Sequence, residues 1–398
     1  MSLDLTKVAS QVGGLLARLK EGLSERNEHL RNALETAHAQ AENLDSLKKK
    51  IAASKTTWLL ADLTDGLDLH IEPTQLPTDF SVIATDGSHI DVDRHRAARC
   101  FLINIGSVVL NYGTNPDALL DSFPDLYVSE DELVISHPET NREQPIEGTL
   151  LGIKRSVDEC RRLVDLAADQ PAGSSTVALV DGTLILWGLE GYPEFVSEQL
   201  LDEGFLYCLN RLREQNGDKK VALASYISLP RGTDVVNTLK VALCPNNPLD
   251  TDKHCKECRT RDCNAVSGIR DRELFAGILG DGERSALFKT TSRIVEKQYG
   301  EHRIYFYYIN VDEEIARVEI PEWVVKDEEL VALTQSLILD QCRRGHGYPV
   351  ALSEAHERAV VTGADRENFW QLVETALADE KIQTFTSAKA RSKNTRWI

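Results

Sequence analysis

The sequence predicts an α/β fold in which a mixed sheet is flanked by helices, with a long N-terminal helical arm before it and a small cysteine-rich insertion within it. An apolar, β-branched run over residues 81–86, followed by Gly87-Ser88, is typical of a buried strand that ends in a turn. Further strand-like runs follow directly, and from residue 148 onward helical periodicity alternates with apolar strands. Antiparallel strands followed by strand–helix alternation favour a mixed sheet covered by helices.

The composition is that of a globular chain with an acidic surface. Of 398 residues, 42% are hydrophobic and 27% are charged, which is enough to bury a large core. No run of about eighteen apolar residues occurs, and the first residues do not show a basic segment followed by an apolar one, so we expect no membrane span, no signal peptide and a cytoplasmic location. The net charge of −18 argues against nucleic acid coating the whole surface, but it leaves room for a local basic groove.

Residues 1–55 are expected to form an N-terminal arm of one or two long helices. Apolar residues recur at helical spacing, and charges fill the positions between them. Two roles stay open for this arm, packing on its own domain or docking with another chain, because its apolar seam is too irregular to identify a coiled coil. A connector containing Pro73 and Pro77 leads to a main domain over 75–380, and a basic tail over 384–398 follows.

The main domain is expected to begin with the strand that ends at Asp86. Residues 99–110 are expected to form two strands joined near Gly106, and residues 113–145, with three prolines, to be loop. The elements predicted after these are helix 148–169, strand 176–181, helix 193–215, strand 220–227, helix 233–242, a hairpin of 303–311 with 315–320, and helices 326–343, 352–361 and 365–378. This order is the outline of a ribonuclease-H-like α/β core.

Two aspartates stand at the ends of apolar strands in the same local pattern. Asp86 is followed by Gly-Ser and Asp181 by Gly-Thr. Two carboxylates delivered in this way can converge on a divalent cation, since Mg²⁺ and Mn²⁺ prefer oxygen ligands. Taken singly, each is more simply interpreted as an Asp-Gly turn, and only the repetition favours a site.

Four of the eight cysteines are clustered in the spacing C-x10-C-x2-C-x4-C, within a predicted insertion over 243–268. They are Cys244, Cys255, Cys258 and Cys263. Four thiolates within twenty residues suit a structural Zn²⁺ site or a Cys₄ iron–sulfur cluster, and His254 is an alternative ligand. Unligated thiols are the other interpretation, because only one C-x2-C pair is present.

Two arginines in the second half of the chain are candidate contacts to DNA phosphates. They are Arg272, in Asp-Arg-Glu-Leu-Phe, and Arg284, in Gly-Glu-Arg-Ser. The alternative for each is an arginine at the end of a surface helix. The aromatic residues at 305–308 are interpreted as sheet core in preference to a base-stacking platform.

Several segments together resemble the NurA family of DNA-end-processing nucleases. They are Thr85-Asp86-Gly87-Ser88, Glu159 ahead of Val180-Asp181-Gly182-Thr183-Leu184, Tyr226-Ile227-Ser228, Asp271-Arg272-Glu273-Leu274-Phe275, Gly282-Glu283-Arg284-Ser285, Ala316-Arg317-Val318-Glu319-Ile320-Pro321, and Gly347-Tyr348-Pro349 followed by Ala355-His356. The order of the segments is the specific part of this resemblance. The cysteine cluster is not part of that pattern.

The resemblance implies a ribonuclease-H-like fold, a homodimer with a central channel, and Mn²⁺-dependent nuclease action on DNA ends beside a hexameric HerA-type ATPase. It also implies that the metal carboxylates are Asp86, Glu159 and Asp181, and that Tyr348 and His356 complete the site. Asp158 is the alternative to Glu159. The secondary candidates, His89 and His346, come from the residues alone.

The chemistry that these residues permit is two-metal hydrolysis of a phosphodiester. Asp86 is expected to bridge two Mn²⁺ or Mg²⁺ ions, with Asp181 and Glu159 each leaning toward one of them. His356 would bind the second ion or carry a proton near neutral pH, and Tyr348 would orient the phosphate or that ion.

We therefore expect a divalent-metal-dependent DNA nuclease. It would resect ends as a 5′–3′ exonuclease, with endonuclease cleavage left open, together with the HerA-type ATPase in double-strand break repair or DNA defence. The alternative from another class is a non-catalytic, metal-stabilised adaptor that binds DNA or the ATPase, which the presence of every proposed ligand disfavours. A third hypothesis is a metal-dependent phosphatase acting on a small phosphoester.

Overall fold

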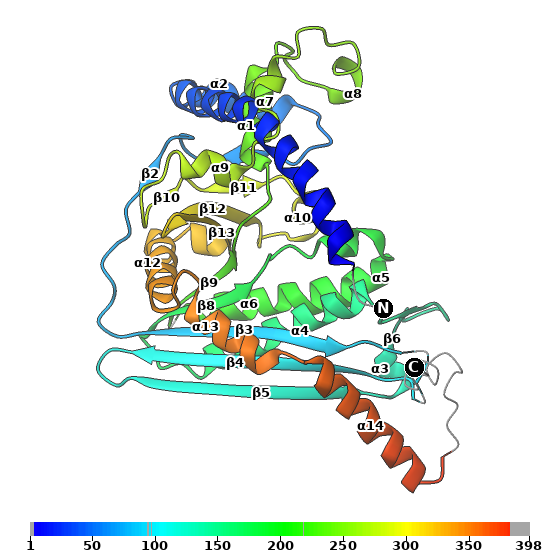
Figure 1. Cartoon of the computed structure of the whole chain (residues 1–398). Coiled ribbons are helices and arrows are strands. Elements are labelled where there is room, and N and C mark those ends of the chain that lie inside the picture. The colour runs from blue at the N-terminus through cyan, green and yellow to red at the C-terminus, as the bar shows by residue number, and fades with distance from the viewer. Residues whose placement is uncertain (1–3, 94, 97, 218, 383–398) are drawn as a thin grey trace. The chain divides into compact units, whose positions relative to one another are not determined.

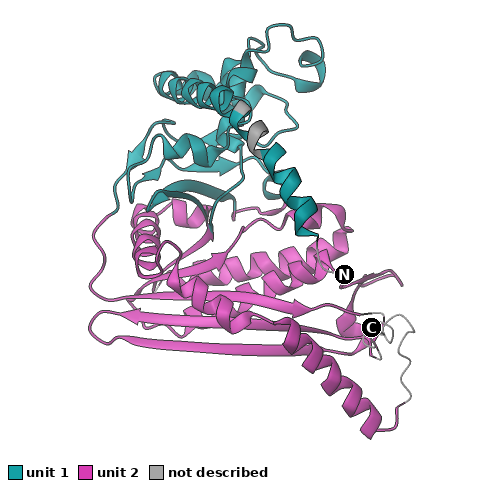
Figure 2. Cartoon of the chain, in the orientation of Figure 1, with its two compact units in different colours: residues 1–73, 227–296, 303–319 teal, residues 74–226, 297–302, 320–398 magenta. Residues whose placement is uncertain are grey.

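The computed structural model describes residues 4–93, 95–96, 98–217 and 219–382 (Figure 1), so the predicted basic tail over 384–398 lies outside the described residues. The chain forms two compact units (Figure 2). Unit 1 comprises residues 1–73, 227–296 and 303–319, and unit 2 comprises residues 74–226, 297–302 and 320–398. Among the helices of the described residues, none combines the length and the apolar content that crossing a membrane requires.

Unit 2 is built on five strands in the spatial order β9–β8–β3–β4–β5. They are β3 (Phe80–Ile90), β4 (Phe101–Tyr112), β5 (Asp117–Tyr127), β8 (Ser175–Asp181) and β9 (Lys220–Ile227). The first three of these pair antiparallel, whereas β3 with β8 and β8 with β9 pair parallel, so the sheet is mixed. Consecutive residues such as Val82 and Ile83 are fully buried, as expected for strands covered on both faces.

Helices α4 (Thr149–Ala168) and α13 (Val350–Ala359) cover opposite faces of strand β3. The Thr85 hydroxyl donates to the backbone carbonyl of Glu159 on α4 at 3.1 Å. The Ser88 hydroxyl donates to the Ala359 carbonyl of α13 at 2.5 Å. Because alternate residues of a strand point to opposite faces, odd-numbered residues here face α4 and even-numbered residues face α13.

The other elements of unit 2 are mainly helical. They are α3 (Glu130–Leu133), the β6 (Val134–Ser136) and β7 (Glu143–Pro145) pair, the 3₁₀ turn η1 (Trp187–Gly191), α5 (Glu194–Ser197), the π-helical η2 (Glu198–Leu206), α6 (Tyr207–Gln215), α11 (Glu322–Val325), α12 (Glu328–Arg344) and α14 (Gly363–Asp379).

Unit 1 combines the N-terminal arm with a second group of strands in the order β1–β11–β12–β13, where β10 pairs with both β12 and β2. Its strands are β1 (Ala61–Leu63), β2 (His70–Ile71), β10 (Arg284–Ser285), β11 (Phe288–Thr290), β12 (Ile304–Val311) and β13 (Glu314–Pro321). Its helices are α1 (Leu5–Ala41), α2 (Leu44–Ala53), α7 (Asp234–Leu243), α8 (Thr251–His254), η3 (Asp262–Val266), α9 (Asp271–Ala276) and, for its first residues, α10 (Arg293–Gln298). Their apolar side chains form one buried cluster that includes Phe275, Phe288 and Tyr308.

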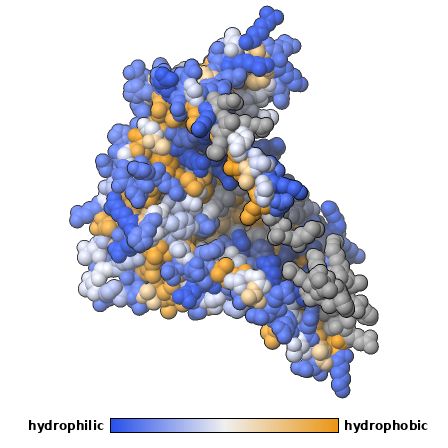
Figure 3. All heavy atoms as spheres, in the orientation of Figure 1, coloured by the Kyte–Doolittle hydropathy of each residue, from blue (hydrophilic) through white to orange (hydrophobic). Residues whose placement is uncertain are grey.

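Residues 1–55, where one or two long helices are expected, contain α1 and α2. Ala33 and Ala37, in the second half of α1, are buried in the cluster of unit 1, whereas Leu15, Leu19 and Leu23 in the first half are exposed. Hydrophilic residues cover much of the face shown in Figure 3, with smaller hydrophobic areas between them.

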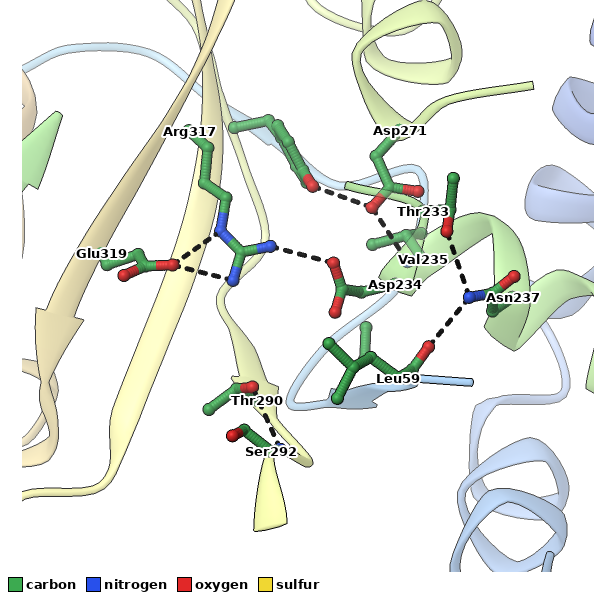
Figure 4. Close-up of polar contacts among 12 residues, drawn as sticks. Leu59, Thr233, Asp234, Val235, Asn237, Asp271, Thr290, Ser292, Arg317 and Glu319 are labelled. Carbon is green, nitrogen blue, oxygen red and sulfur yellow. Dashed lines mark hydrogen bonds and ion pairs between the residues drawn. The ribbon is translucent and has the colours of Figure 1, made fainter. Parts of the chain in front are cut away.

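Buried charges of unit 1 form a connected network around Arg317 of β13 (Figure 4). Its Nε donates to a carboxylate oxygen of Glu319 at 3.0 Å, and another guanidinium nitrogen donates to Asp234 at 3.0 Å. The guanidinium carbon lies 3.6 Å from the centroid of the Phe306 ring. All three charged side chains are almost fully buried, so the cation of Arg317 offsets the cost of burying the two carboxylates.

Asp271 extends the same network to the start of α7. Its carboxylate accepts the backbone N–H groups of Val235 and Val236, at 3.1 and 2.8 Å, and the Tyr308 hydroxyl at 2.8 Å. Burial, with a contribution from Asp234, raises the pKa of Asp271 to about 6. The residue therefore fixes a helix terminus inside the core of unit 1.

The prediction of two strands joined near Gly106 is wrong, because Gly106 lies in the middle of the single strand β4. A Cβ at this position would come within 2.2 Å of the Ala355 carbonyl oxygen, so the glycine allows α13 to pack closely on β4. The predicted loop over 113–145 also contains β5, whose proline, Pro124, is tolerated because β5 is the edge strand of unit 2.

The predicted fold class is confirmed as a mixed α/β fold with helices flanking a mixed sheet. The helices predicted at 148–169, 233–242 and 326–343 correspond to α4, α7 and α12 with ends that agree within two residues. The predicted hairpin corresponds to β12 and β13, which turn at Asp312 and Glu313, both with positive φ.

Candidate active site

The two aspartates lie side by side in unit 2. The prediction that the first strand ends at Asp86 is wrong, because β3 continues through Gly87 to Ile90; Asp181 is the last residue of β8. Thr85 of β3 pairs with Val180 of the parallel strand β8, so the next residues, Asp86 and Asp181, stand at matching positions. Matching positions on paired strands point to the same face of a sheet. The pKa of Asp181 is raised by burial and, in addition, by the charge of Asp86. The structure thus brings these two predicted site residues together.

Helix α13 and the turn before it add two groups on the same face. His356 places its Nδ1 atom 2.7 Å from a carboxylate oxygen of Asp86, with the rest of its ring largely exposed. Tyr348 hydrogen-bonds to Asp181. Burial, then the charge of Asp181, raises the pKa of the Tyr348 hydroxyl, so this group stays a neutral donor.

Glu159 reaches the aspartates from α4, on the other face of β3, through a gap at Gly87. A Cβ on Gly87 would lie 2.5 Å from a carboxylate oxygen of Glu159 and 2.8 Å from Cγ of Arg155. Any other residue here would push both side chains away. The glycine after Asp86 therefore makes room for a third carboxylate beside the strand.

Arg155 lies one helical turn before Glu159 and is its ion-pair partner, with Nε 3.0 Å from Oε1. Both atoms are buried, and neither has a hydrogen bond of good geometry. Burial raises the pKa of Glu159 to about 8, Arg155 opposes this shift, and Asp86 and Asp181 add to it. Near neutral pH the carboxyl therefore keeps its proton unless a further cation approaches.

The neighbouring carboxylate, Asp158, is engaged elsewhere. It lies 2.9 Å from Lys154 Nζ and 2.9 Å from a guanidinium nitrogen of Arg161. Because its charge is paired on both sides, Glu159 is the better candidate ligand on α4.

The donor set fits a divalent cation in its chemistry, although the side chains are not drawn together to coordinating distance. Among the described residues, no group of three or more His, Cys, Asp or Glu side chains is arranged to hold an ion. Glu159 nevertheless presents a buried Oε1 atom that accepts no hydrogen bond, and Asp181 has a raised pKa. A divalent cation would satisfy these carboxylates, which are ligands of the kind that Mg²⁺ and Mn²⁺ take.

The other two predicted histidines differ in their surroundings. His89 is half-buried on β3 beside Arg155, and its Nδ1 atom has no hydrogen-bond partner among the described residues. His346 has a φ of 56° in the turn between α12 and α13.

The two arginines predicted to contact phosphates both lie in unit 1. Arg272 is partly exposed on α9, and its guanidinium donates to the Leu229 carbonyl at 3.2 Å. Arg284 lies on β10, where its side chain is buried and its guanidinium carbon lies 5.6 Å from the centroid of the Tyr307 ring.

The four clustered cysteines lie in a part of unit 1 where only α8 and η3 are regular. The pKa of the Cys263 thiol is raised first by burial and then by Cys244, Cys255 and Cys258, so the four sulfurs gather in one region. In the described residues they do not form a ready ligand group. The predicted metal centre of the insertion is therefore not confirmed.

Sequence reasoning missed Arg155 and the packing role of Gly87. The signal for Arg155 was its spacing of four residues from Glu159 on a helix, which brings two side chains together. Gly87 was interpreted as a turn glycine, and only the position of α4 reveals why a side chain is excluded there.

A mixed sheet with paired aspartates on adjacent parallel strands, and a glutamate from the covering helix, defines a site suited to phosphoryl chemistry. The NurA domain matches residues 80–361 of this chain, and all five predicted catalytic residues fall within that range. The chain belongs to the NurA family, which is a family of nucleases. No curated protein matches the sequence.

Two solved structures show partial similarity. One is described as the crystal structure of LC9-RNase H1, a type 1 RNase H with the type 2 active-site motif, at 10% identity and a TM-score of 0.22, covering 40% of this chain and 69% of that one. The other is prototype foamy virus protease-reverse transcriptase, at 12% identity and a TM-score of 0.19, covering 38% of this chain and 18% of that one. At such scores the fold assignment stands on the strand order described above.

Proposed function

We propose that this chain is a divalent-metal-dependent deoxyribonuclease that hydrolyses phosphodiester bonds at DNA ends. The observation that carries the proposal is the meeting of Asp86, Asp181 and Glu159, from two strands and a helix, in a chain of the NurA nuclease family. The raised pKa values of Asp181 and Glu159 reflect burial together with mutual repulsion, both of which a cation relieves.

In the proposed site, Asp86, Asp181 and Glu159 would hold the divalent cations, Mn²⁺ or Mg²⁺. Bound ions of this kind neutralise the phosphate and lower the pKa of the attacking water. His356 holds its Nδ1 against Asp86, which leaves Nε2 to pass a proton to the departing oxygen. Tyr348 remains a neutral donor that orients the phosphate.

We also propose 5′–3′ digestion by a homodimer that works with a hexameric HerA-type ATPase. Family membership supports this partnership, and the net charge of −18 fits an enzyme that leaves most DNA binding to a motor. Strands labelled at one end only would reveal the polarity. Light scattering of the chain alone, and with the ATPase, would give the stoichiometry.

Cleavage of linear DNA by the full chain is expected to require Mn²⁺ or Mg²⁺. EDTA should stop it, and excess Mn²⁺ should restore it, because without the ions nothing neutralises the phosphate or activates the attacking water. Product lengths from linear duplex, single-stranded and closed circular DNA provide the measurement. Cleavage that persists in EDTA would contradict the proposal, DNA binding without cleavage would favour the adaptor, and activity only on a chromogenic monoester would favour a phosphatase.

We further propose that the four clustered cysteines bind a thiophilic centre, either Zn²⁺ or an iron–sulfur cluster. The gathering of the four sulfurs supports this. Two lysines lie beside them: burial lowers the pKa of Lys240 while Cys263 opposes that shift, and the Lys50 Nζ donates to the Cys244 carbonyl at 2.5 Å. Their positive charges would offset a tetrathiolate centre.

Protein purified without oxygen should contain close to one equivalent of zinc, or iron with visible absorption. The Cys258→Ser variant should lose it, whereas Cys342→Ser, which changes a buried cysteine of unit 2, should retain it. Equal metal content in both variants would contradict the proposal.

A further inference from the structure

Positive side chains are gathered beside the acidic site of unit 2, although the whole chain is strongly acidic. Arg155 on α4 and Arg366 on α14 both act on the half-buried ring of His89, whose pKa is lowered by burial and by these two guanidinium groups. His89 lies on β3, three residues after Asp86. The two arginines therefore lie around the end of the strand that carries the central carboxylate.

Arg155 is anchored at one end and open at the other. Its stem lies across Gly87, and its Nε faces Glu159, yet its side chain is 31% exposed. Glu159 is its one ion-pair partner among the described residues, and that carboxyl also lies beside Asp86 and Asp181. The outer edge of the guanidinium can therefore receive a second anion at the border of the site.

Arg366 is exposed in the first turns of α14, and a guanidinium nitrogen donates to the His89 carbonyl at 3.4 Å. None of the acidic side chains of the described residues forms an ion pair with it. The nearby carboxylate that acts on His89 is Asp91, which accepts the backbone N–H groups of Gly148 and Val92 at 3.0 and 2.8 Å. The positive charge of Arg366 is thus directed to solvent.

We propose that Arg155 and Arg366 bind successive backbone phosphates of the DNA strand whose end enters the carboxylate site. Guanidinium groups suit this role, because their planar donors match phosphate oxygens in pairs. They also offset the repulsion between polyanionic DNA and the three carboxylates. The inference rests on the proposed nuclease function and adds the path of the substrate; Arg366 lies beyond the residues that match the family.

The test is equilibrium binding of a fluorescein-labelled single-stranded oligonucleotide in Ca²⁺, which is used to allow binding without turnover. Arg155→Gln and Arg366→Gln should each weaken binding about 3- to 10-fold, and each should reduce the slope of log affinity against log salt by about 0.7. Arg366→Lys should recover most of the loss. Arg161→Gln is the matched control, because Arg161 lies on the same helix but is paired with Asp158.

Wild-type affinity and salt slope in the Arg155→Gln, Arg366→Gln double variant would overturn the inference. Arg366 does not contact Glu159, so the Arg366 variant tests DNA binding even where Arg155→Gln disturbs that carboxylate. The two proposals can be rejected separately. If the wild-type chain never cleaves DNA but the arginine variants bind it more weakly, the phosphate contacts are supported and the nuclease function is rejected. If the wild-type chain cleaves DNA and the arginine variants bind it as tightly as the wild type, the nuclease function is supported and the phosphate contacts are rejected.

Discussion

Asp86→Asn is expected to abolish DNA hydrolysis, with a rate at least about 10³-fold below wild type. In the proposed mechanism, loss of this metal ligand removes several kcal/mol of charge stabilisation, and each 1.4 kcal/mol or so is worth tenfold in rate. His356 also loses its carboxylate partner at 2.7 Å. Single-turnover cleavage of linear DNA in Mn²⁺ gives the measurement.

The same variant should remain folded and melt in EDTA at or above the wild-type temperature. Asp86 raises the pKa of both Asp181 and Glu159, so removing its charge relieves repulsion in the metal-free chain. Asp158→Asn is the matched control and should keep most of the activity, because Asp158 is paired with Lys154 and Arg161. An active Asp86→Asn enzyme, or an Asp158→Asn enzyme that is equally inactive, would reject this assignment of ligands.

Arg317→Met is expected to produce the largest loss of stability, about 3–5 kcal/mol in the unfolding of unit 1. The substitution keeps an apolar stem over Phe306 but leaves Asp234 and Glu319 buried without their cation. Urea unfolding followed by circular dichroism measures the change.

Arg211→Met is the control for Arg317→Met and should cost less than about 1 kcal/mol, because its pair with Glu214 is exposed. A triple variant that adds Asp234→Asn and Glu319→Gln to Arg317→Met should recover part of the loss, since no buried charge is then left unpaired. A small effect of Arg317→Met alone would show that water reaches the two carboxylates.

Elements with a strong periodic pattern were predictable from the sequence, and elements defined by packing were not. The apolar run that ends at Asp86 and the amphipathic pattern over 148–169 identified β3 and α4. Glycine and proline usually mark turns, so Gly106 and Pro124 favour a turn and a loop where the structure has strands. Here one makes room for α13 and the other lies on an edge strand, and neither fact is local in sequence.

The residues of the candidate site also divide into those that local sequence patterns predict and those that only packing reveals. Asp86 and Asp181 were found from a repeated local pattern, and the family resemblance supplied His356, Tyr348 and Glu159. Arg155 carries no motif of its own, and no local pattern indicates that Arg284 is buried. Charge partners and burial are set by contacts between distant segments, which a single sequence does not display.

The register between β8 and β3 determines whether Asp86 and Asp181 lie on the same face of the sheet. A slip of one residue would turn Asp181 toward α4 and away from Asp86, while Val177, Ala178 and Leu179 would still be covered on either side. Burial of apolar side chains alone therefore does not exclude a form in which β8 is shifted by one residue against β3. Specific activity, more than compactness or helix content, would report the fraction of molecules in which the two strands are correctly matched.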